Sequence, residues 1–285
     1  MLMRALCRAI VFCLLAAPVA ASTTRVRVVA EKVPGSASFV AHNDTACPVV
    51  ITVDISSVSN ATARAGRLAA QVVGPHSTRV LARIQRANPR LAWSYYWKYA
   101  FVFGQPVPSP APYLYRFPFD PSHPRRLSQG NGGTFTHYGP EQYAFDFAMP
   151  EGTLVVAARA GRVGYVVDEF SQGGTTAYFK DKANEVLIVH SDGTLGRYAH
   201  IRHHGALVRE GQEVAAGTPL AYSGSTGFSS LPHLHFDVRV APLHAEGHTV
   251  PLRFADGTRT GLLPTQGRDW PGGGRAQVIA AARRR

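Results

Sequence analysis

The stretch Ser229–Asp237 reads Ser-Ser-Leu-Pro-His-Leu-His-Phe-Asp and has the composition of a β-strand. It places His233 and His235 two residues apart. Because a strand directs alternate side chains to opposite faces, both imidazoles leave the same face, close enough to serve one centre. Asp237 lies on that face too, where it either orients an imidazole through a hydrogen bond or remains a surface carboxylate. Since isolated His-x-His pairs occur by chance, the pair gains meaning only from the rest of the chain.

Two further patches contain the other residues that a hydrolytic zinc site needs. His137 and Asp146 form one patch, and residues 198–200 (Tyr-Ala-His) form the other. Such a site has three protein ligands and a fourth position open for water. Two histidines and one aspartate leave it with a net positive charge, which lowers the pKa of a bound water to about 7. Asp146 lies between two phenylalanines, where an ionised carboxylate is costly without a partner, and this favours a ligand.

Several separated motifs follow one another between residues 128 and 237. They are Ser-Gln-Gly at 128–130, Thr-His at 136–137, Tyr-Ala-Phe-Asp-Phe-Ala-Met-Pro-Glu-Gly-Thr at 143–153, Arg-Tyr-Ala-His at 197–200, Gly-Gln-Glu-Val at 211–214, Gly217, Ser-Gly-Ser-Thr-Gly at 223–227 and Pro-His-Leu-His-Phe-Asp at 232–237. In this order they resemble the lysostaphin/LytM-type zinc metallopeptidases, peptidase family M23.

This resemblance implies a role for each of five residues. His137, Asp146 and His235 match the zinc ligands of the family. His200 and His233 match its two histidines that do not bind the metal, which polarise the water and stabilise the oxyanion of the tetrahedral intermediate. Zn²⁺ is therefore the expected cofactor.

The spacing of the first two ligands departs from that of some family members. Those members have three residues between the histidine and the aspartate, whereas eight residues, 138–145, separate them here. Ligands must be close in space and not in sequence, so a longer loop is compatible with the site. Two more histidines, His203 and His204, follow His200 closely, and the Tyr-Ala-His pattern selects His200.

The first residues of the 285-residue chain are typical of an export signal. Residues 1–21 begin with Arg4 and Arg8, continue with the apolar run Ala9–Ala17, and offer small residues for cleavage after Ala21. The apolar run is too short for a comfortable membrane span, so no transmembrane segment is expected after signal removal. We therefore expect an exported protein, either periplasmic or secreted.

Charge and cysteine content restrict the possible partners. The formal net charge is +12, which in an exported protein favours anionic polymers such as the cell wall with its peptide carboxylates, or acidic lipid headgroups. Nucleic acid is not an expected partner, because the chain has no recognisable nucleic-acid module and is exported. Cys7 and Cys13 leave with the signal, so Cys47 alone remains and forms no intramolecular disulfide.

The pattern of short β-rich runs and turn residues predicts an all-β protein. We expect a β-sandwich-like N-terminal domain at 23–115, a proline-rich connector at 116–126, an antiparallel β peptidase domain with long loops at 127–264, and a basic flexible tail at 265–285. The aromatic cluster at 93–101 is either a ligand platform or, as we favour, strand core.

The motifs and the resemblance together predict a zinc metalloendopeptidase. It would hydrolyse peptide bonds in peptidoglycan stem peptides or cross-links, with zinc-bound water as the nucleophile. The alternative is a non-catalytic wall-binding or carrier-like β module, since Asp181-Lys182-Ala183 resembles a lipoyl attachment site. Export and the five placed His/Asp residues favour the enzyme. We expect residues 23–115 to pack on the peptidase domain and restrict access to its groove. The alternative is a wall-targeting or export-partner domain that leaves the groove open.

Overall fold

The computed structural model describes residues 25–63, 65–67, 70–243, 247–274 and 277–278. The signal sequence expected at 1–21 lies outside these residues. Strands make up the regular structure of the described part, apart from two short 3-10 turns, η1 (Gly139–Glu141) and η2 (Ala177–Phe179). The all-β prediction is therefore confirmed. The described part contains no helix with the length and apolarity that a membrane span requires.

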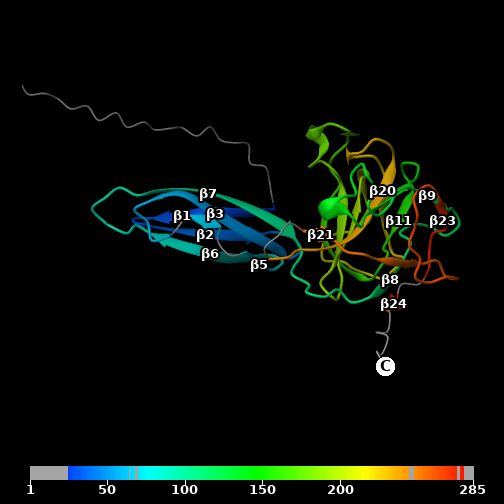
Figure 1. The fold of residues 1–285 in the computed structure, drawn as a ribbon, viewed down its shortest axis with the longest axis horizontal. Helices are drawn as coiled ribbons and strands as arrows, with labels where there is room; N and C mark the ends of the chain where they lie inside the picture. The colour runs from blue at the N-terminus through cyan, green and yellow to red at the C-terminus, as the bar shows by residue number, and fades with distance from the viewer. Residues whose placement is uncertain (1–24, 64, 68–69, 244–246, 275–276, 279–285) are drawn as a thin grey trace, which may run out of the picture.

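Residues 25–104, here called the N-terminal unit, form two sheets packed face to face (Figure 1). One sheet consists, in spatial order, of β1 (Val26–Val33), β2 (Ser36–Asn43) and β6 (Ser77–Gln85). The other contains β7 (Ser94–Phe103), β3 (Val49–Ser59), β4 (Gly66–Arg67) and β5 (Gln71–Val73). Alternate aromatic residues of β7 face the first sheet, and the Trp97 ring lies 5.2 Å from that of Phe39. Apart from the exposed Tyr96, the aromatic cluster is thus strand core.

Residues 105–278, here called the second unit, are built on a large antiparallel sheet. Its strands, in spatial order, are β17 (Glu213–Val214), β12 (Gly161–Val167), β14 (Glu185–Val189), β15 (Leu195–Ala199), β20 (His233–Val240), β10 (Phe145–Ala148), β9 (Arg125–Gln129) and β23 (Asp269–Trp270), with β21 (His248–Thr249) beside β20. A second sheet consists of β11 (Leu154–Val156), β18 (Pro219–Ser223) and β16 (Ile201–Ala206). Two small sheets join β22 (Arg253–Ala255), β8 (Tyr113–Arg116) and β24 (Gln277–Val278), and β13 (Gly173–Gly174) with β19 (Gly227–Phe228).

Alternation along β20 separates the core of the second unit from its polar face. Leu234, Phe236 and Val238 are fully buried in the hydrophobic core. His235 and Asp237 therefore leave the opposite face, as the period of two requires. The register places His235 opposite Asp146 of β10 on one side and Ala199 of β15 on the other. These pairings bring three separate sequence motifs to one place on the sheet.

The proline-rich stretch, which we expected to pack along the second domain, contributes to this core, and so does the tail, which the sequence did not indicate. Phe117 and Phe119 lie in the segment expected to be a connector, yet both are buried in the core of the second unit. The Phe117 ring stacks on that of Phe254 at 4.5 Å and on that of Trp270 at 6.1 Å. Trp270 belongs to the expected flexible tail, where β23 and β24 pair with β9 and β8. Burial of large aromatic surface stabilises these segments although their composition does not favour regular structure.

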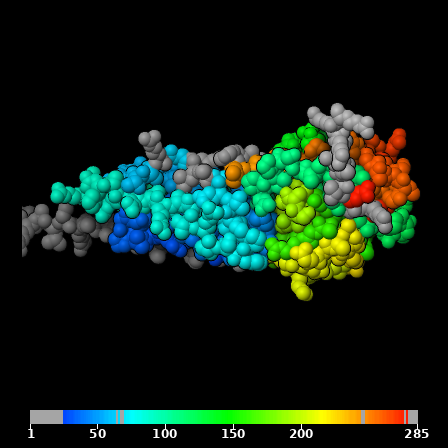
Figure 2. Space-filling view, turned by 90° about the horizontal axis from the view of Figure 1, so that it is seen from below, coloured from blue at the N-terminus to red at the C-terminus, as the bar shows by residue number. Residues whose placement is uncertain are grey.

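The N-terminal unit contacts the same face of the large sheet that carries His235. The contact lies near the end of β20 that is remote from His235. Cys47 is buried against Leu187 and Leu195, and the Phe103 ring lies 4.5 Å from the ring of Tyr165. In the register, Leu195 pairs with Arg239, four residues along β20 from His235. Figures 1 and 2 accordingly show an elongated molecule, in which the N-terminal unit (blue to cyan) extends away from one end of the second unit.

Candidate metal centre

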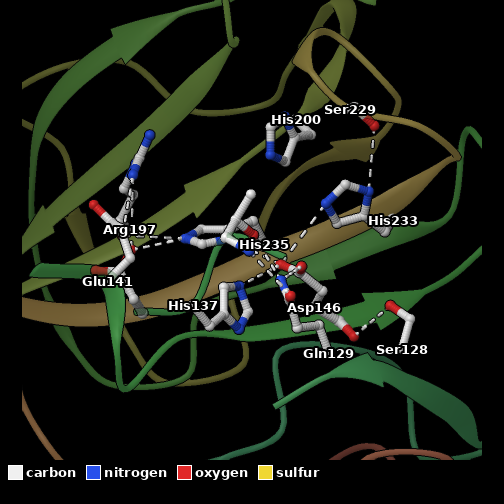
Figure 3. A network of polar contacts seen from close by, with 12 residues as sticks. Ser128, Gln129, His137, Glu141, Asp146, Arg197, His200, Ser229, His233 and His235 are labelled. Atoms are coloured by element: carbon white, nitrogen blue, oxygen red, sulfur yellow. Dashed lines mark hydrogen bonds and ion pairs between the residues drawn. The ribbon is translucent and has the colours of Figure 1, made fainter. Parts of the chain in front are cut away.

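Three side chains from different segments converge on the polar face of the sheet. His137 comes from the loop before β10, Asp146 from β10 and His235 from β20 (Figure 3). Asp146 Oδ1 lies 3.2 Å from His137 Nε2 and 2.9 Å from His235 Nδ1. All three residues are buried, and their potential ligand atoms lie within 4.8 Å of one another. The arrangement offers two ring nitrogens and one carboxylate to a single point, despite the long spacing between His137 and Asp146.

Hydrogen bonds at the other ring nitrogens decide which nitrogen faces the centre. His137 Nδ1 lies 3.0 Å from the carbonyl oxygen of Gly130, which can only accept, so Nδ1 carries the proton. His137 Nε2 is thus unprotonated, and it is buried without a hydrogen-bond partner in the described part of the chain. A buried nitrogen lone pair with no donor is costly, and a cation at this point would satisfy it.

The electrostatics of the centre favour a positive charge. Burial alone would raise the pKa of Asp146, but the neighbouring rings of His137 and His235 hold it well below its ordinary value. Burial alone would lower the pKa of His235, but hydrogen bonds to Asp146 and Asp237 raise it to about 9. Both shifts express the same fact, namely that two buried carboxylates surround the His235 ring. A metal cation fits such a site better than an uncharged ligand does.

Gln129 connects the carboxylate to the loop that carries His137. Its Nε2 donates to Asp146 Oδ2 at 3.0 Å and to Thr136 Oγ1 at 2.6 Å. Its Oε1 accepts from the backbone N–H groups of Phe135 and Thr136. Gln129 belongs to the Ser-Gln-Gly motif at 128–130, from which no role for its side chain was predicted. Because the Oδ2 oxygen is held by Gln129, the Oδ1 oxygen of Asp146 points to the two histidines.

His200 and His233 lie beside the three converging residues and face each other, with ring centroids 4.6 Å apart. His200 Nδ1 lies 2.7 Å from the carbonyl oxygen of Thr226, and His233 Nδ1 lies 2.7 Å from that of Leu231. Each Nδ1 therefore donates, and each Nε2 is left as an acceptor. His233 Nε2 is 3.7 Å from Asp146 Oδ1.

Both of these histidines are kept neutral. Burial is the largest cause that lowers the pKa of His200, and the neighbouring His233 and His235 lower it further. Burial also lowers the pKa of His233, although Asp146 opposes this shift. His200 has a φ of 64°, a strained conformation for a residue other than glycine, which persists only where the surroundings hold it. All five residues selected from the sequence thus lie together.

The amino-acid sequence matches the family model described as peptidase family M23 over residues 140–250. The chain carries an M23 peptidase domain. Over 130 residues it is 32% identical to peptidoglycan DD-endopeptidase ShyC of Vibrio cholerae, covering 46% of this chain and 26% of that protein. Over 110 residues it is 38% identical to murein hydrolase activator NlpD of Escherichia coli, covering 38% of this chain and 24% of that protein.

The chain thus spans about a quarter of the length of these curated relatives. Among solved structures, lysostaphin from Staphylococcus simulans is similar at 30% sequence identity with a TM-score of 0.31, covering 41% of this chain and 43% of that one. The relatives therefore include proteins named as endopeptidases and a protein named as an activator.

The M23 domain also contains a charged cluster that no sequence motif predicted. Arg239 lies on the same face of β20 as His235 and Asp237, because it is two residues further along the strand. It contacts Asp237 and Glu141, and Arg197 of β15 lies beside them. The alternation of β20 could have indicated Arg239. No pattern in the sequence pointed to Glu141, which belongs to the segment between His137 and Asp146.

Proposed function

We propose that the chain is a zinc-dependent endopeptidase, exported to the periplasm or the cell exterior, that cleaves peptide bonds in peptidoglycan stem peptides or cross-links. The observation that carries this proposal is the convergence of His137 Nε2, Asp146 Oδ1 and His235 Nδ1, with the buried His137 nitrogen lacking a partner. Two imidazoles and one carboxylate are a usual protein ligand set for catalytic zinc. The M23 domain and the endopeptidase names of relatives support the substrate class.

Zinc held by these three residues would polarise the scissile carbonyl and lower the pKa of a water molecule. The other chemistry belongs to His200 and His233. With Nδ1–H tied to a carbonyl oxygen, each ring keeps Nε2 as a proton acceptor. One of the two takes the proton from the attacking water and, once protonated, gives it to the leaving amine. Before it gives up this proton, the protonated ring donates a hydrogen bond to the oxyanion of the tetrahedral intermediate.

One relative, NlpD, is named as an activator of hydrolases, so hydrolysis by this chain is the point to test. The five His/Asp residues favour catalysis, because a module that only binds or activates has no need of a converged ligand set. Lys182, the lysine of the lipoyl-like motif, lies over the ring of Tyr178 and is half-buried, which suits a carrier lysine poorly.

The test is digestion of purified muropeptides, with the products identified by mass spectrometry. We expect the protein to shorten or separate cross-linked peptides, because hydrolysis of one amide adds one water to the products. Removal of metal with a chelator should abolish this activity, and added Zn²⁺ should restore it, since the ligands supply no substitute Lewis acid. Intact muropeptides after incubation with the zinc-loaded protein would contradict the proposal and favour a binding or activating role.

The N-terminal unit is proposed to leave the groove open. Its anchor is Glu210, which accepts hydrogen bonds from Arg25 at 2.6 Å, from Ala46 N at 3.2 Å and from Val166 N at 3.0 Å. None of these contacts involves the five residues of the centre within the described chain. A wall-targeting role therefore fits the arrangement better than a steric gate.

We expect Glu210→Ala to loosen this contact without changing catalysis. Losing hydrogen bonds to a largely buried carboxylate should lower the free energy of unfolding by about 1–3 kcal/mol. Cleavage of a short soluble muropeptide, measured well below the unfolding temperature, should keep its rate because the centre is untouched. Faster cleavage by the variant would instead show that the N-terminal unit restricts access to the groove. Glu213→Ala, which alters an exposed residue of β17, serves as the matched control.

A further inference from the structure

The segment between His137 and Asp146 is fastened to β20 by one carboxylate. Glu141 ends the short turn η1 in this segment. Its two oxygens accept hydrogen bonds from the same terminal nitrogen of Arg239, at 3.1 and 2.8 Å. Arg239 in turn donates to both oxygens of Asp237, at 2.8 and 2.7 Å. A continuous chain of charged contacts therefore runs from the loop to the strand that carries His235.

A second arginine reinforces this chain from the neighbouring strand. Arg197 of β15 donates to Glu185 at 2.6 Å and lies 3.8 Å from Glu141 and 3.9 Å from Asp237. Figure 3 shows Arg197 and Glu141 on the side of His235 that faces away from His233. The Asp237 side chain is fully buried, and that of Arg239 is 14% exposed. In such surroundings charged contacts are stronger than they are in water, so the cluster resists rearrangement.

The far end of the chain of contacts reaches the metal centre. His235 Nε2 lies 3.1 Å from Asp237 Oδ2. An ionised carboxylate can only accept, so Nε2 carries a proton, and Nδ1, 2.9 Å from Asp146 Oδ1, is the ring nitrogen that would bind the metal. Arg239 holds both oxygens of Asp237 and thereby fixes the carboxylate against the ring. Such partners of a metal-binding histidine set its orientation and its tautomer.

The same contacts also explain how His137 reaches the centre across a long segment. A longer loop has more conformations to lose when its ends are fixed, so it needs contacts of its own to stay in place. Gln129 holds the part of the loop before His137, and Glu141 holds the part after it. Glu141 thus lies between His137 and Asp146 in the sequence. In space it contacts Arg239, which holds Asp237 against the third ligand, His235.

We propose that Glu141, acting through Arg239 and Asp237, is a positioning residue for the metal centre. It holds the segment 138–145 against β20 so that His137 Nε2 and His235 Nδ1 point to the same spot as Asp146. This inference rests on the proposed function, because it concerns the same three ligands. It adds a residue outside the ligand set whose removal weakens metal binding while the fold remains.

Metal affinity of the full chain tests the proposal. The variants are Glu141→Ala and the milder Glu141→Gln, and Glu213→Gln changes an equivalent but exposed carboxylate on β17 as the control. Each metal-free protein is titrated with Co²⁺, whose visible absorption reports its coordination, and its unfolding temperature is measured. We expect Glu141→Ala to bind Co²⁺ about tenfold to a hundredfold more weakly with an altered spectrum. Glu141→Gln should lie between, because its amide oxygen still accepts from Arg239 but carries no charge.

The outcomes separate the possible failures. A positioning role predicts similar unfolding temperatures for the metal-free proteins and recovery of cleavage by the variants at high metal concentration. Co²⁺ affinity and spectrum equal to those of the wild type in both variants would overturn the proposal, whether or not their stability falls. If the wild-type chain itself bound no Co²⁺ or Zn²⁺, the proposed function would fail, and the experiment would show this before any variant is compared.

Discussion

His235→Ala is expected to lose its zinc and, with it, nearly all cleavage of muropeptides. The Nδ1 atom of His235 is one of three ligand atoms, and two protein ligands fall short of the three that catalytic zinc sites use. Without this third ligand the site binds zinc too weakly to retain it, so the bound zinc per chain should fall from about one to near zero. Metal content after dialysis and the rate of muropeptide cleavage are the two measurements.

His235 lies between the buried carboxylates of Asp146 and Asp237, so the His235→Ala substitution also affects stability. The variant therefore needs controls. Asp146→Asn removes a ligand charge without creating a cavity and should also lose most of the zinc. His203→Ala changes an exposed histidine outside the centre and should retain both zinc and activity. Full zinc occupancy in a folded His235→Ala protein would show that His235 is not a ligand.

The second large effect is expected for the two histidines that do not bind the metal. His200→Ala and His233→Ala should keep their zinc but lower turnover by about 10²-fold or more, as the loss of an acid–base or oxyanion group does. His233 Nε2 lies 3.7 Å from Asp146 Oδ1, and neither histidine belongs to the group of three converging residues. Turnover at saturating substrate and zinc content, measured on the same preparations, provide the comparison.

Zinc retention in the His200→Ala and His233→Ala proteins distinguishes these two histidines from the metal ligands. If either folded variant lost zinc, that residue would have to be reassigned as a ligand. If either kept wild-type turnover, it would have no part in proton transfer. His204→Ala, next to His203 in the same exposed segment, is a suitable control because it changes another histidine near His200.

The sequence was most informative where local geometry determines the outcome. The spacing of His233 and His235 predicted a shared strand face, and β20 places Leu234 and Phe236 in the core between them. Asp146 among phenylalanines predicted a partnered carboxylate, and the structure surrounds it with histidines. The period of two and the cost of an isolated buried charge are properties of a short segment, so they can be read without knowing the fold.

Other features depend on partners distant in the sequence and could not be predicted. Glu141 and Arg239 are 98 residues apart, and only the register of β10 with β20 brings their segments together. Phe117 stacks on Trp270, although the Gly- and Arg-rich composition around Trp270 suggested a flexible tail. In both cases the tertiary partner, and not the local composition, determines where the side chain lies.

We expect zinc to bind between His137, Asp146 and His235, and anomalous diffraction at the zinc absorption edge locates the metal without ambiguity. Crystals of the purified full chain, grown without added metal, would be measured just above and just below the edge. One strong difference peak is expected about 2.0–2.2 Å from His137 Nε2, an oxygen of Asp146 and His235 Nδ1. If this peak is absent, or if it lies between Glu141 and Asp237 on the Nε2 side of His235, zinc does not bind at the proposed ligands.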